Sequence, residues 1–308
     1  MHKAFIITID TEGDNLWTVK DIRQRITTKN ARYLFRFQEL CEKYGFIPTY
    51  LTNYEMAKEE AMKELAGYGL KKGNLEIGAH EHAWNQPPYF PLIKHPVKRE
   101  LPYLNEYPRF LIREKLRCLT NTLEDVFQHR ITSHRGGRWC LNRMIAEELI
   151  ELGYIVDCTC TPGVSWRDDP GWSVFSHGTD WTRCRNRPFY INVDHDRITR
   201  RLLEIPMSIF DLRGTGHLSW LRPNLTNRTE MLEIIKYISD SNYGFAEFML
   251  HSSELMPGGS PTFNNNGKIE KLYQDIDEVF SFANSLGYRG MSLSDYAMRL
   301  VCCRRVES

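Results

Sequence analysis

The chain has 308 residues, of which 42% are hydrophobic and 26% are charged, the balance of an ordinary globular protein. Forty lysines and arginines against 39 aspartates and glutamates leave a net charge of +1, which excludes binding of nucleic acid through a strongly basic surface. The apolar run before Asp10 is too short for a signal peptide, and no run reaches the roughly 18 residues of a transmembrane segment. We therefore expect a cytoplasmic protein with reduced cysteines and a single domain over residues 1–308.

Strand and helix patterns alternate along the chain. Short apolar, β-branched runs predict strands, and longer stretches with apolar residues at helical spacing predict helices. The expected strands are residues 5–9, 47–51, 75–80, 131–134, 154–158, 202–205, 245–251 and 291–293. The expected helices are residues 29–44, 54–68, 110–127, 141–152, 228–239 and 269–286, and residues 161–188 form a long irregular stretch. This order predicts a parallel α/β sheet or barrel that no linker divides.

Polar side chains with catalytic potential stand where five of these strands end. They are Asp10, His80, His134 with Arg135, Asp157, and His251. The C-terminal ends of the strands in a parallel barrel meet at one mouth, so we expect these residues to gather there.

Two pairs of residues in this set have a spacing of two. Asp10 and Glu12 can share one face of an extended segment, with Thr11 turned away, so that one carboxylate binds a cation and the other acts as a base. His80 and His82 can likewise reach one ion together. One carboxylate and two imidazoles suit zinc and equally suit non-haem iron, and the spacing does not choose between them.

Four segments in this order resemble the motifs of the polysaccharide deacetylase family, the NodB-homology group called carbohydrate esterase family 4. The segments are Thr8-Ile-Asp-Thr-Glu12, Gly78-Ala-His-Glu-His-Ala-Trp84, Arg135-Gly-Gly-Arg-Trp139 and Leu250-His-Ser-Ser-Glu-Leu255, which resemble the first, second, third and last motifs, and Asp157 is a looser match to the fourth. The resemblance implies a deformed (β/α) barrel of about seven parallel strands and a divalent metal. Zinc is our first choice, with iron, cobalt, nickel or manganese as further candidates.

The resemblance also implies roles for individual residues. Asp10 would be the general base, Glu12 and His80 metal ligands, Arg135 the group that orients Asp10, and His251 the general acid. Together they would remove an N-acetyl or N-formyl group from an amino sugar. We assign Trp84, Arg138, Trp139 and Asp157, which lie in or beside the motifs, to substrate binding.

The chain departs from the family pattern at two positions. Thr11 separates the base from the metal-binding acid, two residues that are adjacent in many members, and this leaves Asp14 as a rival ligand. The second histidine commonly falls four residues after the first, where this chain has Trp84. We therefore choose His82 as the third ligand from local geometry. His95 and His134 are the two histidines that could replace it.

The expected substrate is an amino-sugar-containing saccharide, nucleotide- or lipid-linked, from surface polysaccharide or lipopolysaccharide biosynthesis, with no nucleic acid as a partner. Two rival functions would use the same residues. One is an amidohydrolase acting on a non-sugar C–N bond, and the other is a non-haem iron enzyme.

Overall fold

Strand β1 (Ala4–Thr11) is buried along its whole length and lies between two parallel neighbours, β10 (Phe245–His251) and β2 (Pro48–Thr52). From β2 the parallel pairing continues through four further strands, and the sheet ends at an antiparallel strand. The parallel strands are β3 (Glu76–Glu81), β4 (Ser133–Gly136), β5 (Val156–Asp157) and β7 (Arg201–Glu204), and the antiparallel one is β6 (Phe189–Asn192). Short strand β11 (Arg289–Gly290) pairs with the start of β1.

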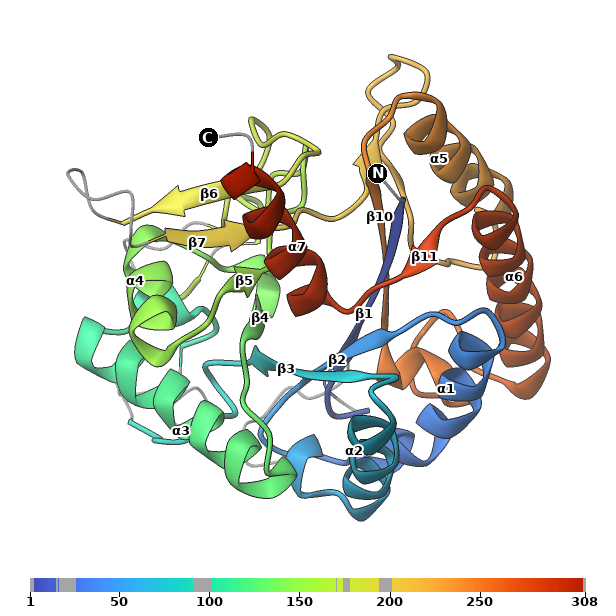
Figure 1. Ribbon diagram of the computed structural model, residues 1–308. Coiled ribbons are helices and arrows are strands. Elements are labelled where there is room, and N and C mark those ends of the chain that lie inside the picture. The colour runs from blue at the N-terminus through green and yellow to red at the C-terminus, as the bar shows by residue number, and fades with distance from the viewer. Residues whose placement is uncertain are drawn as a thin grey trace.

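The computed structural model describes residues 3–14, 16, 26–90, 101–169, 171–173, 178–193 and 201–306. Within these ranges the seven strands β10-β1-β2-β3-β4-β5-β7 form the parallel path of the sheet, which curls into a half-barrel (Figure 1). The expected deformed barrel of about seven parallel strands is therefore confirmed.

Helices cover the outer face of the curled sheet (Figure 1). They are α1 (Leu34–Lys43), α2 (Glu60–Lys72), α3 (Arg109–Phe127), α4 (Arg143–Leu152), α5 (Arg228–Asp240) and α6 (Asn266–Ser285). Short 3-10 turns follow or precede several strands: η1 (Lys29–Tyr33), η2 (Met56–Lys58), η3 (Leu104–Glu106), η4 (Gly137–Trp139) and η5 (Ser252–Leu255). A separate hairpin joins β8 (Ile209–Phe210) to β9 (Ser219–Trp220).

Successive side chains of β1 point to opposite faces, and this alternation organises the interior. Phe5, Ile7 and Ile9 join the large apolar core beneath the helices. Ala4 and Ile6 point into the curl, where a second apolar cluster contains residues of α7 (Leu293–Val306). The next inward positions on β1 are polar, so the inside of the barrel is apolar at the N-terminal ends of the strands and polar at their C-terminal ends.

Most expected elements occur within a few residues of their predicted bounds, and the described part of 161–188 forms turns and one isolated bridge. The predicted strand at 291–293 is wrong, because the strand is β11 and Leu293 already begins α7. Strands β6, β8 and β9 were not expected either. No helix in the described ranges combines the length and apolarity needed to cross a membrane.

Candidate active site and metal centre

A pocket of about 200 Å³ opens at the C-terminal ends of the parallel strands. Its lining combines acidic, imidazole and aromatic side chains, one arginine and two apolar positions. The lining residues are Asp10, Glu12, Leu16, His80, His82, Trp84, Gly136, Arg138, Trp139 and His251. Nine of them lie within the four motifs quoted above, and Leu16 is the remaining one.

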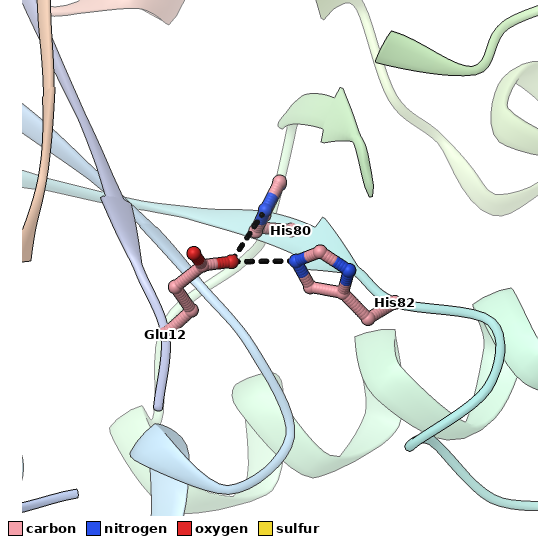
Figure 2. A group of neighbouring side chains, drawn as sticks. All are labelled: Glu12, His80 and His82. Atoms are coloured by element: carbon pink, nitrogen blue, oxygen red, sulfur yellow. Dashed lines mark hydrogen bonds and ion pairs between the residues drawn. The ribbon is translucent and has the colours of Figure 1, made fainter. Parts of the chain in front are cut away.

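Glu12, His80 and His82 converge on one point in this pocket (Figure 2). Glu12 Oε2 lies 3.2 Å from His80 Nε2 and 2.5 Å from His82 Nε2, and the three ligand atoms all lie within 4.8 Å of one another. Metal–ligand bonds of about 2.0–2.2 Å place the ligands of a tetrahedral ion roughly 3.4 Å apart, so the separation between Glu12 and His82 would have to widen by about an ångström. The donor set therefore fits a divalent cation, and the spacing-based choice of His82 agrees with this geometry.

Hydrogen bonds around the triad hold two of its members in ligand orientation. His80 Nδ1 lies 2.9 Å from the carbonyl oxygen of Arg135, to which it donates, so its Nε2 lone pair faces the ion site. The backbone of Glu12 is held by Asn30 and Ser252: Asn30 Nδ2 donates to the Glu12 carbonyl at 2.8 Å, and the Glu12 N–H donates to Ser252 Oγ at 3.1 Å.

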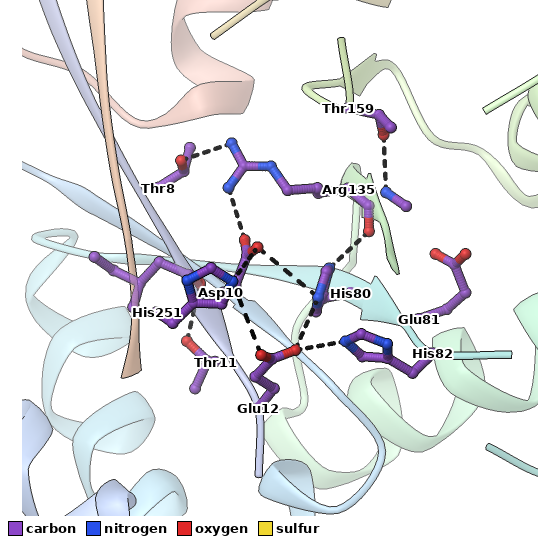
Figure 3. Close-up of polar contacts among 12 residues, drawn as sticks. Thr8, Asp10, Thr11, Glu12, His80, Glu81, His82, Arg135, Thr159 and His251 are labelled. Carbon is purple, nitrogen blue, oxygen red and sulfur yellow. Dashed lines mark hydrogen bonds and ion pairs between the residues drawn. The ribbon is translucent and has the colours of Figure 1, made fainter. Parts of the chain in front are cut away.

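Asp10 is almost completely buried and is oriented by Arg135 (Figure 3). Arg135 Nη1 donates to Asp10 Oδ1 at 2.7 Å, while Nη2 donates to Thr8 Oγ1 and to Glu247 Oε1, each at 2.8 Å. The second oxygen of Asp10, Oδ2, lies 3.6 Å from Nε2 of His251 and 3.9 Å from Nε2 of His80. One carboxylate oxygen is thus fixed by a guanidinium, and the other faces the pocket.

His251 ends β10 and stands beside Asp10 with Nε2 toward the pocket. Its other ring nitrogen, Nδ1, lies 3.0 Å from Arg222 Nη2 and 3.4 Å from Glu254 Oε2. Glu254 also accepts from the His251 N–H at 2.8 Å and pairs with Arg222 at 2.9 Å. These contacts hold the imidazole of His251 on the side that faces away from the pocket.

Burial and neighbouring charges set the ionisation of the site. Burial alone raises the pKa of Asp10, but the charges of Arg135, His80 and His251 outweigh burial and lower it. Burial likewise opposes ionisation of Glu12, and the two histidines beside it bring its pKa well below the usual range. Burial opposes the charging of His80, yet Asp10 and Glu12 raise its pKa to about 9 in the metal-free protein. Both carboxylates are therefore ionised at neutral pH.

Asp157 and His134 do not join the pocket, which corrects two expectations. Both side chains are completely buried on the outer face of the sheet, where His134 Nδ1 donates to Asp157 Oδ2 at 2.6 Å and Nε2 donates to Glu81 Oε2 at 2.8 Å. Burial lowers the pKa of His134, but these two carboxylates raise it to about 9 overall. Adjacent side chains on a strand point to opposite faces of the sheet, so the side chain of His134 points outward because that of Arg135 points into the barrel. We therefore retain neither Asp157 as a substrate contact nor His134 as a ligand.

Asp14, the rival to Glu12 as the acidic ligand, has a different place in the fold. Its carboxylate accepts from the N–H groups of Lys29 at 2.6 Å and Asn30 at 3.3 Å, so it holds η1 and lies outside the ligand triad. Thr11 is turned away from the pocket, as expected, and its Oγ1 donates to the Ile9 carbonyl. His95 lies outside the described residues.

The glycines of the third motif allow close backbone approach. A Cβ on Gly137 would lie 2.1 Å from the Glu81 carbonyl oxygen and 3.0 Å from His82 Nδ1, and one on Gly136 would lie 2.2 Å from the Cys140 carbonyl oxygen. η4 thus packs directly against the end of β3, where His80 and the adjoining His82 lie.

Three residues that support the site were not identified from the sequence. Arg222 lies in the irregular segment after β9, where nothing in the sequence pattern connects it to His251. Glu247 lies on the same face of β10 as His251, four residues earlier, and could have been found by counting inward positions. Asn30 belongs to a segment predicted simply as a helix, and its contact with Glu12 depends on the fold.

No protein-family model matches the sequence, and no curated protein matches it. Among solved structures, the chain is similar to a proposed polysaccharide deacetylase from Mycobacterium smegmatis, with a TM-score of 0.59 and 15% identity over 99% of this chain and 92% of that one. It is also similar to a 4-alpha-glucanotransferase from Thermococcus litoralis, with a TM-score of 0.55 and 13% identity over 96% of this chain and 40% of that one. Enzymes of different chemistry share this fold, so activity has to be argued from the site.

Proposed function

We propose that this chain, whose fold is that of the NodB-homology deacetylases, is a metal-dependent hydrolase that removes an N-acetyl or N-formyl group from an amino sugar. The observation that carries the proposal is the position of Asp10. Its Oδ1 is fixed by Arg135 at 2.7 Å, and its Oδ2 lies between His251 and the ligand His80 in one pocket. An oriented base, an imidazole acid and a ligand triad in one cavity are the parts that amide hydrolysis requires.

The residues divide the work as follows. Glu12, His80 and His82 would hold the divalent cation, zinc being our first choice. When bound, the cation supplies Lewis acidity to the amide carbonyl and to the attacking water. Asp10 Oδ2 accepts a proton from that water. His251 Nε2, on the same side of the pocket, donates a proton to the departing nitrogen.

The size and lining of the pocket support a saccharide substrate. At about 200 Å³ the pocket is smaller than the roughly 300–1,000 Å³ of typical ligand sites, so it accommodates one sugar unit with its acyl group while the remaining units lie outside. Trp84 and Trp139 provide flat apolar walls against which a sugar ring can stack, and Trp139 is itself stacked on Trp166 at 6.1 Å.

The test is release of acetate or formate from N-acylated sugars and from matched non-sugar amides by protein loaded with Zn²⁺. We expect the sugars to be hydrolysed, and Asp10→Asn to lose about 10²- to 10⁴-fold in kcat while binding the metal normally. Glu12→Ala and His80→Ala should lose the metal as well, as measured by elemental analysis. Exclusive hydrolysis of the non-sugar amides would favour the rival amidohydrolase, and a strict requirement for iron and dioxygen would exclude hydrolysis.

A further inference from the structure

Arg138 is the one arginine or lysine among the described residues that line the pocket. Its place in the chain is unusual. Arg138 and the following Trp139 both have left-handed backbone conformations, with φ values of 54° and 57°, although neither is glycine. Such conformations are uncommon for residues with large side chains, and they concentrate at binding and catalytic sites. In Arg135-Gly-Gly-Arg-Trp139 the two glycines do not take the strained positions, which are instead occupied by the two large side chains that line the pocket.

The guanidinium of Arg138 is held in place by two neighbours, but one of its hydrogen-bond donors has no acceptor among the described residues. Its Nη2 pairs with the Asp169 carboxylate, and its Cζ lies 4.8 Å from the centre of the Tyr103 ring. Its Nε is buried and has no hydrogen-bond partner among the described residues. A buried donor without a partner is costly, and an acidic ligand in the pocket that draws the guanidinium toward itself would give this Nε an acceptor.

Asp169, the ion-pair partner of Arg138, is a weak competitor for a ligand. The Asp169 side chain is 60% exposed, whereas the Arg138 side chain is 31% exposed. Ion pairs at the surface contribute little because water and salt screen them. The planar guanidinium can bind a carboxylate or a phosphate through two parallel hydrogen bonds, a geometry that sugar hydroxyls do not match in strength.

We infer that the substrate is an acidic saccharide, with a carboxylate or a phosphate on the N-acylated sugar or on the unit joined to it, and that Arg138 binds this group. The inference rests on the proposed function and names its substrate class. A sphere with the volume of the pocket is about 7 Å across, so the acidic group and the scissile amide belong to the same or adjacent units. The phosphate form includes nucleotide- and lipid-linked sugars, and the carboxylate form includes uronic acids.

The test compares three saccharides that share one N-acetylated unit: a neutral disaccharide, the same disaccharide with a uronic acid as its second unit, and the same N-acetylated unit with a phosphate. The zinc-loaded protein should hydrolyse at least one acidic saccharide with a kcat/KM at least tenfold above that of the neutral one, and the two acidic arms tell carboxylate from phosphate. Arg138→Gln should lower this preference by about 10- to 100-fold. Asp169→Asn, which removes the competing carboxylate, should raise the preference for the acidic saccharide. The matched control is Arg167→Gln, because Arg167 pairs with Asp180 outside the pocket and its side chain is 67% exposed.

Binding provides a second readout that does not depend on turnover. Calorimetry with the Asp10→Asn variant should show that the preferred acidic saccharide binds more tightly than the neutral one. In the double variant that also carries Arg138→Gln, this difference in affinity should disappear. Equal hydrolysis and equal binding of all three saccharides, or an equal loss for all three in Arg138→Gln, would overturn the inference and leave the proposed function standing. If none is hydrolysed, the proposed function fails, and the binding difference alone then supports or overturns the role of Arg138.

Discussion

Replacing Arg135 by methionine tests the central support of the site. The side chain is completely buried and donates to four oxygen acceptors: Asp10 Oδ1, Thr8 Oγ1, Glu247 Oε1 and the Cys158 carbonyl. Methionine fills a similar volume but leaves the Asp10 carboxylate buried without its cation. Removing one partner of a buried pair costs about 3–5 kcal/mol, a large fraction of the roughly 5–15 kcal/mol by which domains are stable.

The expected loss can be measured by urea unfolding and by thermal denaturation, where it corresponds to a fall in melting temperature of roughly 5–8 °C for a chain of 308 residues. Glu247→Gln is the matched control. Burial raises the pKa of Glu247 and outweighs the opposing effect of Arg135, so a neutral amide should cost less than about 1 kcal/mol. Arg135→Lys keeps the positive charge but lacks the planar guanidinium that donates to several acceptors at once. This variant should lose roughly a hundredfold in kcat because Asp10 is misplaced.

The Arg135 variants should still bind metal, because His80 is held by the backbone carbonyl of residue 135 and not by its side chain. If Arg135→Met were as stable as the wild type, or if Arg135→Lys were fully active, the proposed orientation of Asp10 by this arginine would be wrong.

Three further predictions concern the metal centre and the acid. Gly137→Ala should weaken Zn²⁺ binding by tenfold or more in a competition titration, because its Cβ would press on the Glu81 carbonyl at 2.1 Å and displace the end of β3; unchanged affinity would contradict this packing. Excess Zn²⁺ should raise the melting temperature of the wild type, and a chelator should reverse the rise, while His80→Ala should respond to neither. Burial raises the pKa of Glu254, but Arg222 and His251 lower it to about 2 overall. The ionised carboxylate therefore stabilises the folded protein above pH 4.5, and this stabilisation is lost as the pH falls toward 2. The stability difference between wild type and Glu254→Gln, up to about 3 kcal/mol, should therefore shrink between pH 5 and pH 2 in urea titrations, and a difference independent of pH would refute the assignment.

The clustering of Glu12, His80 and His82 could be predicted from the sequence because these residues lie on extended segments with alternating side chains. A spacing of two places Glu12 beside Asp10 and His82 beside His80, and the ends of parallel strands bring the two pairs together. The same rule, applied to the fourth strand, would have excluded His134 once Arg135 was assigned to the interior. Strand ends alone identify a region of the barrel, whereas the face of each strand decides which residues reach the pocket.

Other features depend on tertiary contacts that leave no local pattern. Helix α7 follows a strand of only two residues, and its packing against Ala4 and Ile6 is what defines its apolar side. Arg222 reaches His251 from an irregular segment, so its place behind the imidazole follows from the path of the chain and not from the spacing of residues. The left-handed conformations of Arg138 and Trp139 are likewise unexpected next to two glycines.

The change from apolar to polar residues along the inside of β1 has a consequence for protein engineering. Ala4 and Ile6 contact α7, whereas Asp10, further along the same strand, faces the pocket. Substitutions that improve packing around Leu293 and Tyr296 therefore act at the opposite end of the barrel from the catalytic groups. A library confined to that end can be selected for thermal tolerance alone, and one confined to the pocket walls for new specificity, with the two sets of gains then combined additively.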